Sequence, residues 1–218
     1  GHLPDDFSFL MIGVDSTGQR ELGKITKATF RGKEFDFLPV LHYSEDKARD
    51  AAKSIKDSIN FQFMQGLMRH HGTDPHHFLY HTHLFPDLPR MVVYDRAIRH
   101  VLRRLQGAKI VFSNAPRHYA EAVLDIMGVR HAFDAICSIE RMRFRPKPGI
   151  HGFLHLLRDH RLNPARCILV EDSAENLKTA KRLGMRTVWI SRATRAPAWV
   201  DLRLKSVLEL PRRLGALG

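Results

Sequence analysis

The stretch of sequence that decides the fold is Cys167-Ile168-Leu169-Val170-Glu171-Asp172-Ser173-Ala174-Glu175-Asn176. An apolar run ends there in two adjacent carboxylates, and helical spacing begins directly after them. Short apolar runs are typical of buried strands in parallel sheets, and Ser173 suits the N-cap of the helix that follows. In doubly wound α/β folds, ligands bind at the carboxyl ends of strands. The stretch therefore predicts a strand, a functional loop and a helix.

Glu171 and Asp172 can be interpreted in two ways. Adjacent carboxylates repel each other and are costly to desolvate unless a cation lies between them and a substrate. Hard divalent ions such as Mg²⁺ prefer carboxylate oxygens and often arrive with phosphate. Alternatively, the helix dipole favours acidic residues at the start of a helix. Other parts of the sequence are needed to distinguish a metal site from an acidic helix start.

A regular alternation of strand and helix patterns runs through residues 96–192. Strands that alternate with helices indicate right-handed βαβ crossovers, and hence an α/β fold with a doubly wound, three-layer parallel sheet. The apolar runs predict strands at residues 109–112, 135–138, 167–170 and 186–191. The helical spacing predicts helices at residues 96–105, 118–126, 149–160, 177–183 and 207–214.

The amino-terminal part of the chain has a different pattern. An apolar run predicts a strand at residues 7–14, and residues 25–30 and 34–38 predict a hairpin that turns at Arg31-Gly32-Lys33. A strong helix start at Ser44 predicts a helix to about residue 60, and interrupted helical spacing continues to residue 90.

The length of 218 residues fits a core domain with a smaller insert. A content of 44% hydrophobic and 27% charged residues is ordinary for a globular protein. We expect a core of residues 3–44 and 93–218, in which residues 3–44 supply strands of the core or an added β-meander. Residues 45–92 are expected to form a small helical cap domain.

Composition also bears on location and partners. No apolar run approaches the ~18 residues of a membrane span and no signal peptide is evident, so we expect a cytoplasmic protein with no membrane partner. Cys137 and Cys167 fall in strand patterns, which predicts buried, inert thiols. The net charge of +12 fits a solvated basic surface, an anionic small substrate or nucleic acid. Because the basic residues are scattered, we expect no nucleic-acid partner.

Six histidines fall between His70 and His83, and His77 and His81 stand one helical turn apart. That spacing can bind a metal ion. No Glu or Cys joins them, however, so we favour partly exposed helical histidines, some of them near a substrate phosphate.

Polar groups of complementary kinds follow three of the predicted strands. Ser113 and Asn114 offer a hydroxyl and an amide, Lys147 offers a cation between two prolines, and Glu171 and Asp172 supply acids. Because the carboxyl ends of parallel strands lie at one edge of the sheet, these groups can converge. They suit phosphoryl transfer, with Ser113 and Asn114 on the phosphoryl oxygens, Lys147 neutralising charge, and Asp172 holding Mg²⁺ beside Glu171. A nucleophile is missing from this set.

The ordered set of motifs resembles the haloacid dehalogenase (HAD) superfamily of phosphohydrolases. The matching segments are Ile110-Val111-Phe112-Ser113-Asn114, Arg145-Pro146-Lys147-Pro148, and Leu169-Val170-Glu171-Asp172 with Asn176 shortly after. Phe112-Ser113-Asn114-Ala115, Ile139-Glu140-Arg141 and Val170-Glu171-Asp172-Ser173-Ala174-Glu175-Asn176-Leu177 look more closely like the pyrimidine 5′-nucleotidase branch. Residues 67–72 look like its helical cap, which makes Arg69, His70 and His71 candidate substrate contacts.

The chain departs from the family at its start. The family opens with a strand and Asp-x-Asp-x-Thr, whose first Asp attacks phosphorus and whose second is a general acid. The best substitute is Met11-Ile12-Gly13-Val14-Asp15-Ser16-Thr17-Gly18, with Asp15 as nucleophile and metal ligand and Thr17 in place of the second acid. Asp15 also suits a plain turn, and Asp36 is a rival anchor that leaves too little chain for the usual cap helices.

The resemblance implies a Mg²⁺-dependent phosphomonoester hydrolase that acts on a nucleoside monophosphate or similar small phosphorylated substrate. The alternative is a HAD-like protein that keeps the phosphate and metal pocket but lacks a working nucleophile. A third possibility, a basic nucleic-acid-binding module on an α/β scaffold, requires a contiguous Lys/Arg face.

Overall fold

The computed structural model describes residues 9–13, 27–30, 33–36, 68 and 72–217. The chain divides into two compact units, one made of Gly1–Thr17 and His83–Gly218 and the other of Gly18–Thr82. Asp15, Thr17, Arg69, His70 and His71, together with the helix predicted at residues 44–60, lie outside the described residues. The domain boundaries expected from the sequence stay a prediction.

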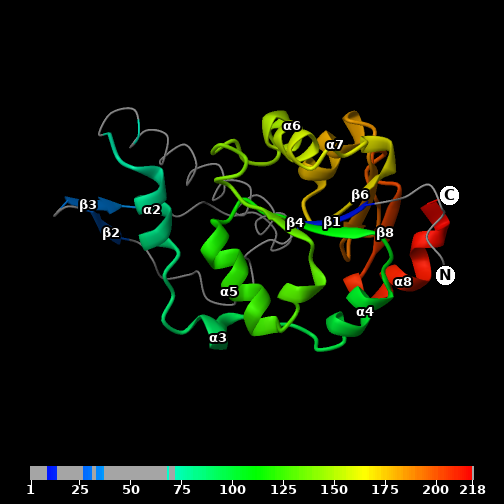
Figure 1. Cartoon of the computed structure of the whole chain (residues 1–218), viewed down its shortest axis with the longest axis horizontal. Coiled ribbons are helices and arrows are strands. Elements are labelled where there is room, and N and C mark those ends of the chain that lie inside the picture. The colour runs from blue at the N-terminus through cyan, green and yellow to red at the C-terminus, as the bar shows by residue number, and fades with distance from the viewer. Residues whose placement is uncertain (1–8, 14–26, 31–32, 37–67, 69–71, 218) are drawn as a thin grey trace. The chain divides into compact units, whose positions relative to one another are not determined.

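A six-stranded sheet forms the centre of the first unit (Figure 1). Its strands are β1 (Phe9–Gly13), β4 (Ala108–Phe112), β5 (Ala135–Cys137), β6 (Cys167–Glu171), β7 (Arg186–Ile190) and β8 (Leu202–Leu204). The spatial order is β5-β4-β1-β6-β7-β8, and every neighbouring pair is parallel. Numbered along this sheet alone, the order is 3-2-1-4-5-6, that of a doubly wound fold. The predicted fold class is confirmed.

Helices cover both faces of this sheet, α6 and α7 on one side and α4, α5 and α8 on the other (Figure 1). Their bounds are α4 (Ile98–Arg104), α5 (Arg117–Met127), α6 (Ile150–Asp159), α7 (Ala174–Arg182) and α8 (Leu210–Arg213). Ile168 and Val170 of β6 pack in one core cluster with α4, α5 and α8. Leu169 is fully buried outside that cluster, and it faces the other layer because strand side chains alternate. Both faces of β6 are therefore apolar, as its sequence predicts.

Short helical segments connect these elements. They are α3 (Leu88–Met91), η1 (Arg130–Ala132), η2 (Pro164–Arg166), η3 (Val207–Glu209) and η4 (Leu214–Leu217). None of the helices in the described part of the chain combines the length and apolar character that crossing a bilayer requires. The cytoplasmic location stays a prediction.

The second unit contains the expected hairpin. Strands β2 (Lys27–Phe30) and β3 (Lys33–Asp36) pair in antiparallel register, and α2 (Pro75–Thr82) lies later in the same unit. The strand expected at residues 7–14 does not extend this hairpin into a meander, because β1 pairs with β4 and β6 in the parallel sheet. Asp36 ends a strand of the two-stranded sheet, so it does not follow a strand of the main sheet as a HAD nucleophile would.

Two features of the carboxyl-terminal region differ from the sequence prediction. The helix expected at residues 207–214 is divided into η3, α8 and η4. Pro211 lies in the first turn of α8, where its missing N–H is tolerated, so the α-helix begins there and not at Val207. Strand β8 was not predicted from the sequence.

Candidate active site

Three neighbouring strands deliver their carboxyl ends to one edge of the sheet. Strand β4 ends at Phe112 and leads to Ser113 and Asn114, and β6 ends at Glu171 and leads to Asp172. Strand β1 lies between them, with its last residue, Gly13, opposite Phe112. In sheets of this order the ligand crevice lies where the strand sequence reverses direction, which here is at β1.

Lys147 contacts both β4 and β6, the strands on either side of β1. Its ammonium Nζ donates to the carbonyl oxygen of Phe112 at 2.8 Å and to Glu171 Oε2 at 2.7 Å. Because β1 runs between β4 and β6, an ammonium in contact with both strands lies across the carboxyl end of β1. The Lys147 and Glu171 side chains are only 4% and 1% exposed. The structure thus places a buried positive charge where the chain leaves the central strand.

Asn114 holds the backbone of Lys147. Its Oδ1 accepts the Lys147 N–H at 2.8 Å, and its Nδ2 donates to the Lys147 carbonyl at 3.0 Å. Both polar ends of the amide therefore contact one residue and fix the loop that carries the ammonium. A contact between Asn114 and substrate stays a prediction.

Ser113 is buried at the end of β4. Its N–H donates to the Cys137 carbonyl at 3.0 Å, which continues the pairing with β5, and its Oγ accepts the Ala115 N–H at 3.1 Å. A serine hydroxyl can donate as well as accept. Ser113 thus occupies the strand-end position that the sequence predicts for it.

Glu171 is the electrostatic partner of Lys147. Burial alone would raise the pKa of Glu171, but the Lys147 ammonium and hydrogen bonds from Asp172 and Ser173 outweigh it and lower the pKa to about 2. The backbone N–H groups of Asp172 and Ser173 reach Oε1 at 3.1 and 3.3 Å. Both carboxylate oxygens are thus engaged within the protein, and Glu171 serves as the counter-ion of Lys147.

Asp172 differs from Glu171 because it is exposed. The carboxylate oxygens of Asp172 suit Mg²⁺, because this ion binds one or two carboxylates and completes its coordination shell with water and phosphate oxygens. No group of three His, Cys, Asp or Glu side chains gathers among the residues that the structure describes. The exposed carboxylate of Asp172 therefore fits an ion that is shared with a substrate.

Sequence reasoning missed two residues that contact this loop. The indole Nε1 of Trp189 donates to the carbonyl of Asp172 at 2.8 Å, and that of Trp199 donates to the carbonyl of Ala174 at 2.9 Å. No sequence signal marks them, since Trp189 belongs to an apolar strand and Trp199 lies in the connection that follows it.

The structure also describes the helical histidines and the two cysteines. His77 and His81 are exposed on α2 with ring centroids 4.3 Å apart, as expected for helical surface histidines. Cys137 and Cys167 are buried free thiols, and burial raises their pKa to about 12 and about 11. The predicted burial of both thiols is therefore confirmed, and their inertness stays a prediction.

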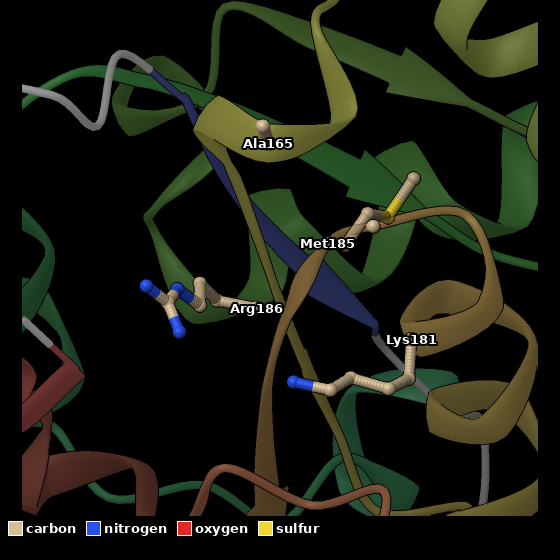
Figure 2. A pocket seen from close by; sticks show the side chains of 5 residues that line it. Ala165, Lys181, Met185 and Arg186 are labelled. Carbon is tan, nitrogen blue, oxygen red and sulfur yellow. The ribbon is translucent and has the colours of Figure 1, made fainter.

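A small hollow of about 180 Å³ opens at the other edge of the sheet (Figure 2). It is lined by Ala165, Lys181, Gly184, Met185 and Arg186. Ala165 precedes β6 and Arg186 begins β7, so the hollow lies at the amino ends of these strands. It is separate from the groups assembled around Lys147.

Curated relatives with phosphatase names match part of the chain. It is 28% identical over 130 residues to validoxylamine A 7′-phosphate phosphatase of Streptomyces hygroscopicus subsp. limoneus, covering 57% of this chain and 60% of that protein. It is 30% identical over 110 residues to hexitol phosphatase B of Escherichia coli K12, covering 48% and 49%. The chain thus spans about half to three fifths of the length of these relatives.

Solved structures and a family model extend the comparison. The L-2-haloacid dehalogenase from Xanthobacter autotrophicus has a TM-score of 0.57 at 14% identity, over 95% of this chain and 98% of that one. A HAD phosphatase from Thermococcus onnurineus has a TM-score of 0.55 at 16% identity, over 96% and 99%. The model of the haloacid dehalogenase-like hydrolases matches residues 37–184, well over half of the chain. The chain belongs to the haloacid dehalogenase-like hydrolase family.

Proposed function

We propose that this protein is a Mg²⁺-dependent phosphomonoester hydrolase that acts on a small phosphorylated substrate. The observation that carries the proposal is the Lys147 ammonium, held between the ends of β4 and β6 beside Ser113 and Asp172. A fixed cation at the ligand-binding edge, next to a hydroxyl and an exposed carboxylate, complements a phosphoryl group and its metal ion.

Each residue at this edge has a role in the proposal. Ser113 donates to a phosphoryl oxygen, and Lys147 neutralises the charge that develops in the transition state. Asp172 holds Mg²⁺, which when bound offsets the phosphoryl charge. Glu171 holds the Lys147 ammonium in place, a role that suits it better than metal coordination because both of its oxygens already accept hydrogen bonds.

Asp15 is the proposed nucleophile. It follows Gly13, the last residue of β1, by two positions. The central place of β1, below the Lys147 ammonium, supports this choice over Asp36. The family match begins at residue 37 and so does not include Asp15. Thr17 cannot act as a proton donor, and loss of a general acid slows departure of an alkoxide by about 10²–10⁴-fold.

Two classes of substrate are open. Resemblance to the pyrimidine 5′-nucleotidase branch favours a nucleoside monophosphate, with Arg69, His70 and His71 of the cap as contacts. The names of the two relatives favour instead a substrate such as validoxylamine A 7′-phosphate or a hexitol phosphate. A panel of p-nitrophenyl phosphate, nucleoside monophosphates and hexitol phosphates distinguishes them by kcat/KM.

The test measures phosphate release with Mg²⁺ and with EDTA for the parent, Asp15→Asn and Asp172→Asn. Glu175→Gln is the matched control, since Glu175 is a nearby exposed acid on α7. We expect turnover only with Mg²⁺, loss in both Asp variants and parental activity in Glu175→Gln. Full activity in Asp15→Asn or Asp172→Asn would refute that residue's role. An inactive parent would leave the phosphate-binding alternative.

A further inference from the structure

The two tryptophans of this chain both bind the loop that carries Asp172. Trp189 donates its indole N–H to the carbonyl of Asp172, and Trp199 donates to the carbonyl of Ala174. The loop is short, the two acceptors lie two residues apart, and the donors come from different segments. Two rigid indole donors thus restrain the backbone of a single turn.

Both peptide groups that flank Asp172 are held. Its N–H donates to Glu171 Oε1 at 3.1 Å, and its carbonyl accepts the Trp189 indole at 2.8 Å. Fixing the peptide planes on both sides of a residue fixes the direction of its Cα–Cβ bond. The exposed carboxylate of Asp172 is thus aimed by its backbone, although its side chain lies at the surface. A metal ligand that is oriented in advance binds more tightly, because less freedom is lost on binding.

The strand that carries Trp189 is paired beside the loop. Trp189 lies in β7, directly opposite Glu171 in the register between β6 and β7. Its indole therefore reaches the loop from the strand next to β6, which the loop follows.

Trp199 acts from a segment that is itself anchored. Its own carbonyl accepts Thr187 Oγ1 at 2.8 Å, and Asp201 Oδ2 accepts the Thr187 N–H at 2.9 Å. Asp201 also pairs with Lys181 near the end of α7. Residues 199–201 therefore hold α7 near both of its ends, at Ala174 and at Lys181.

We propose that Trp189 and Trp199 are positioning residues that hold Asp172 in its metal-binding orientation, with Trp189 acting directly and Trp199 through the start of α7. The inference rests on the proposed role of Asp172 as the Mg²⁺ ligand. It also makes the tryptophan fluorescence of the protein a reporter of metal occupancy.

The test measures Mn²⁺ affinity, with free Mn²⁺ counted by electron paramagnetic resonance, for the parent, Trp189→Phe, Trp199→Phe and Asp172→Asn. Tyr94→Phe is the matched control, because it removes a ring-borne hydrogen bond to the Ile126 carbonyl near the far end of α5. We expect about tenfold weaker binding in Trp189→Phe, as is usual when a residue that supports a ligand is removed. We expect a smaller loss in Trp199→Phe, none in Tyr94→Phe and no site in Asp172→Asn. A merely structural role would lower the melting temperature in Trp189→Phe and Tyr94→Phe alike and leave both affinities unchanged.

The outcomes separate this inference from the proposed function. A Mn²⁺ site that Asp172→Asn abolishes but Trp189→Phe leaves at parental affinity overturns the positioning role alone. Absence of a Mn²⁺ site in the parent overturns the role of Asp172 and this inference with it. If a tryptophan variant fails to fold, Mg²⁺ titration of the parent decides. We expect a saturable fluorescence change that Asp172→Asn lacks, and an unresponsive parent refutes the inference.

Discussion

Lys147 and Glu171 form a buried ion pair, an arrangement in which desolvation opposes the mutual attraction of the charges. The pair is compensated by three further contacts, since Lys147 also reaches the Phe112 carbonyl and Glu171 also accepts the Asp172 and Ser173 amides. Stability alone does not favour such a pair over apolar residues. Its presence at the edge where sheets of this order bind ligands is consistent with selection for a fixed positive charge.

Removal of one partner is expected to destabilise the fold strongly. Lys147→Met leaves the Glu171 carboxylate buried without its cation, which costs about 3–5 kcal/mol. The double variant Lys147→Met/Glu171→Gln removes both charges and should recover part of that loss. Denaturant unfolding of the two single variants and the double variant measures the coupling. Strictly additive losses would contradict a direct interaction, and all three variants should lack phosphatase activity.

Asn114→Ala is expected to weaken both the fold and the site. It removes two hydrogen bonds to the Lys147 backbone, worth about 1 kcal/mol each, and frees the loop that carries the ammonium. We expect a loss of about 1–3 kcal/mol in unfolding free energy and a lower kcat. Asn163→Ala is the control, because Asn163 also accepts a backbone N–H but lies at the amino end of β6. Equal kcat in the two variants would contradict a positioning role for Asn114.

The positions of Ser113, Lys147 and Asp172 could be predicted because polar residues directly after apolar runs lie at strand ends whatever the details of packing. The division of roles between Glu171 and Asp172 could not. Adjacent residues at the end of a strand point to opposite sides of the sheet. Which of the two carboxylates turns inward depends on its contact with Lys147, and a contact between segments distant in sequence cannot be read from the local pattern. The partners of Asn114 were missed for the same reason.

Helix α7 is held in place by polar contacts in its second half as well as by its apolar face. Thr179 Oγ1 donates to the Pro148 carbonyl at 2.7 Å, which joins the helix after the acid loop to the loop of Lys147. Lys181 pairs with Asp201, the last residue of the β7–β8 connection. The two loops of the site are thus braced through one helix.

The contact at Asp201 makes the stability of this bracing depend on pH. Burial alone would raise the pKa of Asp201, but hydrogen bonds from Lys181 and Thr187 and the Lys181 charge lower it below its ordinary value. A lowered pKa stabilises the fold above the ordinary value of about 3.9, and the contribution is lost as pH falls through the lower, folded-state pKa. Because the pair is partly exposed, we expect about 1 kcal/mol or less.

Unfolding free energy measured between pH 7 and pH 2.5 checks this. Asp201→Asn should be less stable than the parent near neutral pH, and the difference should shrink below pH ~4. A difference that is constant with pH would show that the carboxylate charge is irrelevant.

Gly152 in α6 is required by a close approach. A Cβ at this position would lie 2.5 Å from the Arg145 carbonyl oxygen and 2.9 Å from Met142 Sδ. Gly152→Ala should therefore lower the stability by about 1–3 kcal/mol, although alanine is the better helix former by about 1 kcal/mol. The control is Gly215→Ala, where a Cβ meets nothing within 4 Å. Thermal unfolding of both variants tests this, and a stabilised Gly152→Ala would show that the loop before Lys147 yields freely.

At the level of elements, the predicted strands and helices of residues 96–192 are close to those observed because each combines an apolar face with a clear start or stop. The αL cap at Gly128, with a φ of 65°, is one such stop. The place of β1 could not be decided, since residues 7–14 read equally well as a meander strand and as a core strand. Only pairing with β4 and β6, distant in sequence, resolves it.

The whole molecule carries a formal charge of +12. Exposed charges are screened over about 8 Å at physiological ionic strength, so a general field attracts anions without forming a specific site. We expect an oligonucleotide of about 20 nucleotides to bind weakly at low salt and not measurably at about 0.15 M salt. The KM for the phosphatase substrate should rise only modestly with salt. Fluorescence anisotropy across a salt series measures the first, and affinity that persists at 0.15 M would support a nucleic-acid partner.

The central position of β1 has a consequence for how the protein is made. Phe9 pairs with Ala108 on one side and with Cys167 on the other, so β1 is synthesised long before β6, its second neighbour. At ~5–20 residues per second, roughly 3–12 s separate the synthesis of Phe112 from that of Glu171. During that interval the β6-facing edge of β1 is unpaired, and such an edge is prone to pair with other chains. The arrangement that places the Lys147 ammonium over β1 therefore also makes the nascent protein most vulnerable to misassembly just before its site can form.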